Sequence, residues 1–195
     1  MKNKFWAFPL ITALLLCGCE NSPTEQPAVS SSLTETAQTE KSQPQTTPEP
    51  VPADEASQPL TVEEYGRITA EYWQEYTDIT NEINQLVNSS EGDFEKIKEM
   101  NGEIVEAHDR AEAVMDKFSE IAPPSEFEAL HQKLVSSAQT QKAWIERQKE
   151  AYCADTAEEG NAVYGEILEE MEQIPAEDLF PAVYVKIRLK LQGLE

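Results

Sequence analysis

The sequence predicts an all-α fold, in which a disordered tether precedes an antiparallel bundle of three long helices and one or two shorter C-terminal helices. From Leu60 onward, apolar residues recur at steps of three and four, which is the period of an amphipathic helix. Residues 20–59 instead consist mostly of Ser, Thr, Pro, Gln, Glu and Ala, with no aromatic residue. Such a segment cannot bury enough apolar surface to offset the entropy of ordering, so we expect it to be disordered.

The first predicted helix begins at Thr61, an N-cap candidate that is followed by Glu63 and Glu64 in the first turn. It should end near residues 88–92, where Asn, Ser and Gly cluster. Trp73 lies beside its apolar stripe, and the aromatics there form either an inter-helix core, which we favour, or a groove that contacts a peptide or glycan. The stripe consists of Tyr65, Ile68, Tyr72, Tyr76, Ile79, Ile83 and Leu86.

Two further long helices follow. The second has a stripe from Phe94 to Ile121 and is stopped by Pro123 and Pro124. The third opens at Ser125 and has inward-facing apolar residues as far as Tyr152. Short connections between long helices predict antiparallel neighbours.

The C-terminal part is more ambiguous. Residues 157–174 predict a fourth helix that Pro175 closes, and Pro181 can begin a last one. Residues 183–191 alternate strictly between apolar and polar, which by itself is typical of a strand. The same stretch also fits helical spacing, and no second strand candidate exists to pair with it, so we favour a helix.

The N-terminus combines a basic start, a short apolar run and a cysteine. Lys2 and Lys4 precede apolar residues 5–16, a run too short to span a bilayer as a helix. Leu16-Cys17-Gly18-Cys19 then resembles the lipobox of bacterial lipoproteins, although Cys17 stands where the pattern usually has Ala, Ser, Thr or a small aliphatic residue. The resemblance implies that residues 1–18 are a signal peptide and that Cys19 is lipidated. Composition and apolar spacing then assign 19–59 to the lipidated Cys and the tether and 60–195 to the folded domain.

Cleavage and lipidation at this site would leave Cys153 as the one free thiol, so no intramolecular disulfide could form in the mature protein. Cys153 is then either buried as a small hydrophobic residue, which is the simpler expectation, or paired between two chains.

The chain is strongly acidic. Its formal charge is −22, and removal of residues 1–18, which hold Lys2, Lys4 and no acid, takes it to about −24. From Leu60 onward, 30 acidic and 12 basic residues give about −18. Such a charge disfavours binding to nucleic acid or to anionic lipid headgroups and is compatible with cations or a basic protein.

Between Lys149 and Lys186 the sequence holds ten acidic residues and no base. Like charges at this density destabilise a helix, so we expect solvent ions, a partner or the C-terminal Lys186, Arg188 and Lys190 to compensate them. The residues that we expect to bind a partner are Glu158, Glu159, Glu166, Glu169, Glu170 and Glu172.

Metal binding has one weak candidate, the pair Glu128 and His131, whose spacing matches the Glu-x-x-His motif of di-iron bundles. Those sites need a second such motif, and His108 has Val105 three residues before it. A turn near Ala122 would also set the two histidines about 9 Å out of register. We therefore expect both histidines to lie half-buried at stripe edges with polar partners, and we expect no metal cofactor.

Enzymatic chemistry also has little sequence support. Cys153 falls about 33 Å from His131 along the third predicted helix, and no Gly-x-Ser-x-Gly or phosphate-binding loop occurs.

The expected function is a non-enzymatic, lipid-anchored envelope module that presents an acidic helical domain to an envelope protein. The alternatives are a carrier for a small ligand or metal and a holdase-like chaperone. We expect the outer membrane as its location in a diderm host, and the outer face of the plasma membrane in a monoderm.

Overall fold

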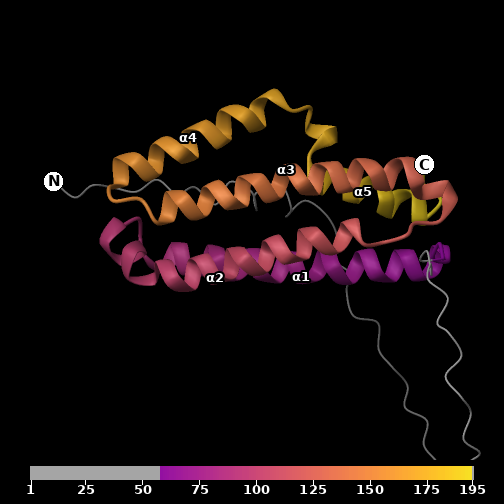
Figure 1. Ribbon diagram of the computed structural model, residues 1–195, viewed down its shortest axis with the longest axis horizontal. Coiled ribbons are helices and arrows are strands. Elements are labelled where there is room, and N and C mark those ends of the chain that lie inside the picture. Colours follow the sequence, from indigo (N-terminus) through magenta and orange to yellow (C-terminus); the bar gives the residue numbers. More distant parts are fainter. Residues whose placement is uncertain (1–57, 195) are drawn as a thin grey trace, which may run out of the picture. The chain divides into compact units, whose positions relative to one another are not determined.

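The computed structural model describes residues 58–194, and these residues contain helices and turns but no strand (Figure 1). The all-α prediction is confirmed for this part of the chain. The signal peptide and all but the last two residues of the tether lie outside the described residues. The elements are α1 (Val62–Ser89), α2 (Phe94–Ser119), η1 (Ser125–Phe127), α3 (Glu128–Tyr152), α4 (Ala157–Gln173), η2 (Ala176–Asp178) and α5 (Phe180–Leu191), of which η1 and η2 are single 3-10 turns.

Side-chain caps explain where three of the helices begin. The hydroxyl oxygen of Thr61 accepts a hydrogen bond from the Glu64 N–H, and the Glu64 carboxylate accepts one from the Thr61 N–H. Thr156 and Glu159 make the same reciprocal pair at α4. At α2 the Asp93 side chain caps the helix without a reciprocal bond. These bonds satisfy N–H groups that have no partner within the helix.

The third helix begins slightly later than predicted. After Pro124, residues 125–127 form the turn η1, and the α-helical hydrogen bonds begin only at Glu128. Close by, the N–H of Leu60 donates to the carbonyl of Ala122 at 3.0 Å, so the start of α1 is joined to the α2–α3 connection.

The alternating stretch 183–191 is helical. Val183 and Ile187 are 1% and 0% exposed, whereas Val185, which would share their face in a strand, is 49% exposed. Burial therefore follows the helical period and not the alternation. Pro181 lies in the first turn of α5, where its missing N–H costs no hydrogen bond.

Helix α3 is central to the packing. It contacts α2, α4 and α5, and α2 also packs along α1. Helix α4 packs mainly on α3, and in Figure 1 its C-terminal half diverges from α3 before the chain turns back through η2 into α5. None of the helices among residues 58–194 has an apolar stretch long enough to cross a membrane.

Aromatic side chains from α1, α2 and α5 form the centre of the larger core. Phe118 is fully buried, and its ring meets Tyr72 and Phe180 edge-on at centroid distances of 5.6 and 5.4 Å. Trp73 stacks on Tyr184 at 4.2 Å. The aromatics of α1 therefore pack into an inter-helix core, as favoured from the sequence.

Candidate functional site

His131, one member of the weak metal pair, lies in the core. It is 5% exposed, and its Nδ1 is 3.1 Å from the Tyr65 hydroxyl, which can donate to it. The backbone of Phe118 and Ile121 favours the charged form of the ring, whereas its Nε2 is buried and has no hydrogen-bond partner within residues 58–194. Glu128 is exposed, so the structure does not bring the pair together on a common site.

His108 is buried in a different part of the bundle. It is 1% exposed, and its Nδ1 lies 2.7 Å from the carbonyl of Ile104, so this nitrogen carries the proton. The side chain of Gln148 provides a second polar contact. The expectation of half-buried histidines is wrong, because the helix packing encloses both rings, although the polar partners are present.

Burial lowers the pKa of both histidines, because desolvation penalises the imidazolium form more than the nearby carbonyls favour it. Both rings are therefore neutral packing groups at pH 7. Within residues 58–194, no group of three or more His, Cys, Asp or Glu side chains is arranged to hold a metal ion.

Cys153 is exposed, so the expectation that it is buried is wrong. It occupies the C-cap of α3, where its N–H bonds to the carbonyls of Lys149 and Glu150 and the chain turns outward toward α4. The turn that follows Tyr152 therefore leaves the thiol at the surface. Pairing between two chains stays a prediction.

The basic residues of α1, α2 and α3 are almost all paired with acids. Lys98, which lies over the Phe94 ring, is the exception among these three helices. Lys149 illustrates the pattern, because it reaches both Asp109 and Glu112 of α2, at 2.8 and 2.5 Å. The other pairs are Arg67–Glu71, Lys96–Glu91, Arg110–Glu82, Lys117–Glu75, Lys133–Asp178, Lys142–Asp116 and the two made by Arg147.

Helix α4 and η2 carry acidic residues and no base. Arg147 of α3 compensates two of them, since its guanidinium lies 2.8 Å from Glu166 and 2.5 Å from Glu170. The indole N–H of Trp144 also donates to Glu170, at 3.3 Å. These contacts tie the middle of α4 to α3.

The C-terminal bases form no ion pair with the acids of α4, although they were expected from the sequence as one source of compensation. Lys186 donates to the backbone carbonyl of Glu177, Arg188 to that of Gly66, and Lys190 to that of Glu126. Helix α5 takes this position because its apolar face packs on α1 and α3, and this carries its bases to backbone carbonyls instead of the carboxylates of α4.

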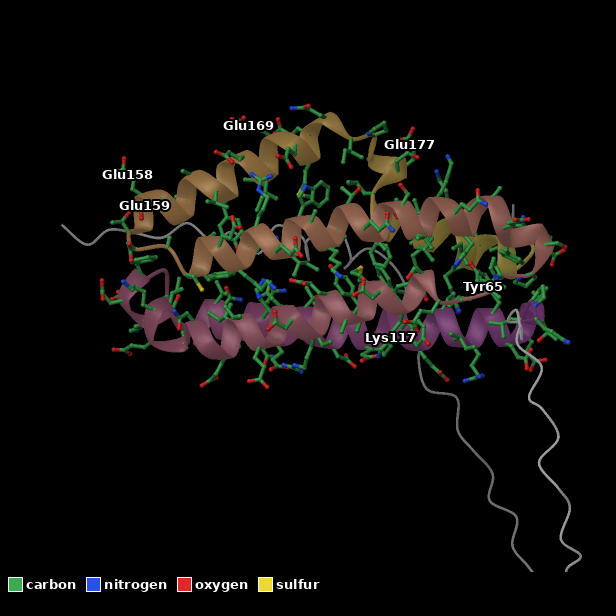
Figure 2. All side chains as sticks on the ribbon, in the orientation of Figure 1. Tyr65, Lys117, Glu158, Glu159, Glu169 and Glu177 are labelled. Atoms are coloured by element: carbon green, nitrogen blue, oxygen red, sulfur yellow. The ribbon has the colours of Figure 1, made fainter. Side chains whose placement is uncertain are left out.

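Three of the predicted partner-binding residues therefore keep uncompensated charges. Glu158, Glu169 and Glu172 are exposed and make no ion pair within residues 58–194. Glu159 is engaged in the helix cap, and Glu166 and Glu170 share Arg147. Figure 2 shows Glu158, Glu169 and Glu177 along the outer side of α4 and η2, directed away from the other helices. We call α4 and η2 together the acidic arm.

A groove of about 340 Å³ lies where the acidic arm diverges from α3. We call it the α3–α5 groove, because residues of both helices form it together with the connection between α4 and α5. Its floor includes Trp144, Phe180 and Val183, which are all nearly fully buried. The other lining residues are Lys133, Ser136, Ser137, Thr140, Ile174, Asp178 and Leu179.

Sequence reasoning missed this groove, although α3 carries a signal for it. Ser136, Ser137 and Thr140 are small polar residues at helical spacing, where a fully packed interface would have larger apolar side chains. Their small size keeps α3 from filling the space beneath the diverging arm.

Comparison with known proteins identifies a family but no characterised relative. Neither the curated proteins nor the solved structures include a significant match. A family of unknown function, DUF6376, matches residues 65–177, which is more than half of the chain and runs from the first turn of α1 into η2. The chain therefore belongs to the DUF6376 family.

Proposed function

We propose that this protein is a non-enzymatic, lipid-anchored lipoprotein of the bacterial envelope whose acidic arm binds a basic partner protein. The observation that carries the proposal is the concentration of acidic residues on α4 and η2, which carry no base. All bases of α1 to α3 except Lys98 are paired with acids, whereas Glu158, Glu169 and Glu172 of the arm are exposed and have no counter-charge within residues 58–194.

The electrostatic repulsion among the carboxylates of the arm supports a role in binding. Carboxylates that repel one another along a helix lose that repulsion when a cationic surface approaches, so binding of a basic protein is favoured electrostatically. Nucleic acid and anionic headgroups would be repelled by the same surface. A non-enzymatic role is supported by the two buried histidines, which are engaged in packing.

The lipid anchor is supported by the lipobox at Leu16 to Cys19, which lies outside the described residues. A lipid on Cys19 would hold the protein at the outer membrane of a diderm or at the outer face of a monoderm plasma membrane. A Cys19→Ser variant should fail to incorporate labelled palmitate and should leave the membrane fraction. Retention of both properties in that variant would contradict the anchor.

The partner proposal is tested by crosslinking the full-length protein in its native cells. The test variant replaces Glu158, Glu169 and Glu172 with Gln. Its control replaces Glu99, Glu103 and Glu106, three exposed acids of α2, in the same way, so both variants change the charge equally. We expect the arm variant to lose a crosslinked protein that wild type and the α2 control retain.

Equal losses in the two variants would show that total charge, and not the acidic arm, attracts the partner. Retention of the crosslink in the arm variant would contradict the proposal. The captured protein is identified by mass spectrometry, and we expect its contacting surface to be rich in Lys and Arg.

A further inference from the structure

The α3–α5 groove has an apolar floor of a size that suits one or two side chains. Trp144, Phe180 and Val183 are 4%, 1% and 1% exposed, so the floor is fixed by core packing. The volume of about 340 Å³ equals that of about eleven water molecules and lies at the small end of ligand pockets. A whole helix would not fit in it, whereas an anchoring side chain would.

The rim of the groove is negative. Helix α4 ends there, with acidic residues and no base in its last turn, so neither its macrodipole nor its carboxylates are compensated by the helix itself. The turn η2 adds Glu177 and Asp178. Lys133 is the basic residue that lines the groove, and its 3.7 Å pair with Asp178 is exposed and weak.

We infer that the α3–α5 groove takes an apolar side chain from a segment of the basic partner, while Lys or Arg residues beside that side chain meet Glu172 in the last turn of α4 and Asp178 of η2. This inference rests on the proposed function and specifies its partner as a segment with an apolar anchor between basic residues. Removal of the anchoring side chain's own apolar surface from water supplies affinity, and the acidic rim selects the charge of the flanks.

Charge complementarity favours such a segment over two other occupants of the groove, namely a second copy of this chain and residues 20–59 of the same chain. A second copy of this chain offers few available cations, because the bases of residues 58–194 contact acids, backbone carbonyls or aromatic rings. Residues 20–59 of the same chain contain seven acids and a single base, Lys41, so the rim would repel them.

The first test places a photo-crosslinking amino acid at Ser136, on the groove lining, in the full-length protein in its native cells. The matched control places it at Asn81, an exposed uncharged residue of α1. We expect Ser136 to crosslink to a partner peptide in which mass spectrometry finds an apolar residue flanked by Lys or Arg. The Asn81 position should give no such product.

Three outcomes of this crosslinking would overturn the inference. They are attachment to residues 20–59 of this chain, attachment to a second copy, and attachment to a segment without Lys or Arg. Absence of any product specific to Ser136 would overturn it as well.

The second test fills the groove. Ser136→Trp and Thr140→Phe each add an aromatic ring at its lining, and Asn81→Trp is the control; circular dichroism verifies that each variant is folded. The probe is a short synthetic peptide with one Phe flanked by lysines, measured against the purified protein by fluorescence anisotropy. We expect both filling variants to bind it about tenfold more weakly than wild type or Asn81→Trp.

Two altered peptides separate the contributions of the anchor and its flanks. Replacing Phe by Ala, or the lysines by Glu, should each weaken binding to wild type by about tenfold. Equal binding of the Phe and Ala peptides would overturn the inference, since charge alone would then explain the affinity.

Crosslinking in cells, carried out with the Gln variant of the acidic arm and with the groove-filling variant Ser136→Trp, also separates this inference from the proposed function. If the Gln variant of the acidic arm loses the partner while Ser136→Trp retains it, the groove inference fails and the proposed function stands. If both variants retain the partner, both fail.

Discussion

Helices α2 and α4 pack against the same central helix in very different ways. Helix α2 buries nine of its 26 residues, including Phe118, Ile104 and Met115. Helix α4 buries three of 17, and two of those are Ala157 and Gly160. Apolar burial therefore holds α2, whereas α4 depends on Ile167, the contact of Tyr164 with Tyr152, its cap and the bridge from Arg147. The comparison separates a scaffold, α1 to α3, from an arm that the scaffold presents to solvent.

The largest expected effect on stability comes from truncating a buried side chain of the scaffold. Phe118→Ala removes a fully buried ring that contacts Tyr72 and Phe180, and should lower the free energy of unfolding by about 3–5 kcal/mol. Urea denaturation followed by circular dichroism measures this change. A loss below about 1 kcal/mol would show that the core does not depend on this aromatic cluster.

A second substitution tests whether the arm opens independently of the scaffold. Ile167 is 1% exposed, and Ile167→Ala should weaken the closed state of α4 by about 2–3 kcal/mol. Hydrogen exchange should accelerate in α4 while the slowest amides of α2 and α3 keep their rates. Equal acceleration in all helices would instead show that α4 unfolds only together with the scaffold.

The scaffold should be acid-sensitive, since both histidines lie within it. Burial lowers the pKa of His108 and His131 in the folded state, so folding favours their neutral forms. The unfolded chain binds protons at these residues near pH 6.5, and stability should fall as the pH drops from that value toward the folded pKa values. Urea denaturation at pH 8 and pH 5 measures the loss, and His108→Gln should reduce it. A pH-independent midpoint would contradict the prediction.

The smallest effects should come from the two matched helix caps. Thr61→Ala and Thr156→Ala each remove a capping hydroxyl, at a cost of about 1 kcal/mol. Loss of the α1 cap should lower global stability, whereas loss of the α4 cap should accelerate hydrogen exchange only in the acidic arm. Similar global losses in both variants would remove the distinction between scaffold and arm.

Local sequence signals predicted the helices well and the side-chain environments less well. Thr61 and the Pro123-Pro124 pair act within a few residues, so they marked the start of α1 and the end of α2 from sequence alone. His131 and Cys153 depend on what packs around them. The turn that leaves Cys153 exposed and the hydroxyl of Tyr65 beside His131 are set by tertiary structure, which a single helical stripe does not encode.

The candidate site was predicted only in part. The run of acids from Glu150 to Asp178 was visible in the sequence, but its division into compensated and free charges was not, because Arg147 belongs to a different helix. The α3–α5 groove likewise requires α4 to diverge from α3. That divergence reflects the geometry of two helices and the connection after Ile174, and no single residue specifies it.

The hydrogen bond between Leu60 and Ala122 also has a mechanical consequence. A pull on the chain ahead of Leu60 enters the fold at the first turn of α1 and at the α2–α3 connection, which this bond links. Helix α4 joins the chain through residues 153–156, at the other end of α3. The load path therefore runs into the scaffold and bypasses the arm, so that tension on the N-terminal segment need not distort the surface that α4 presents.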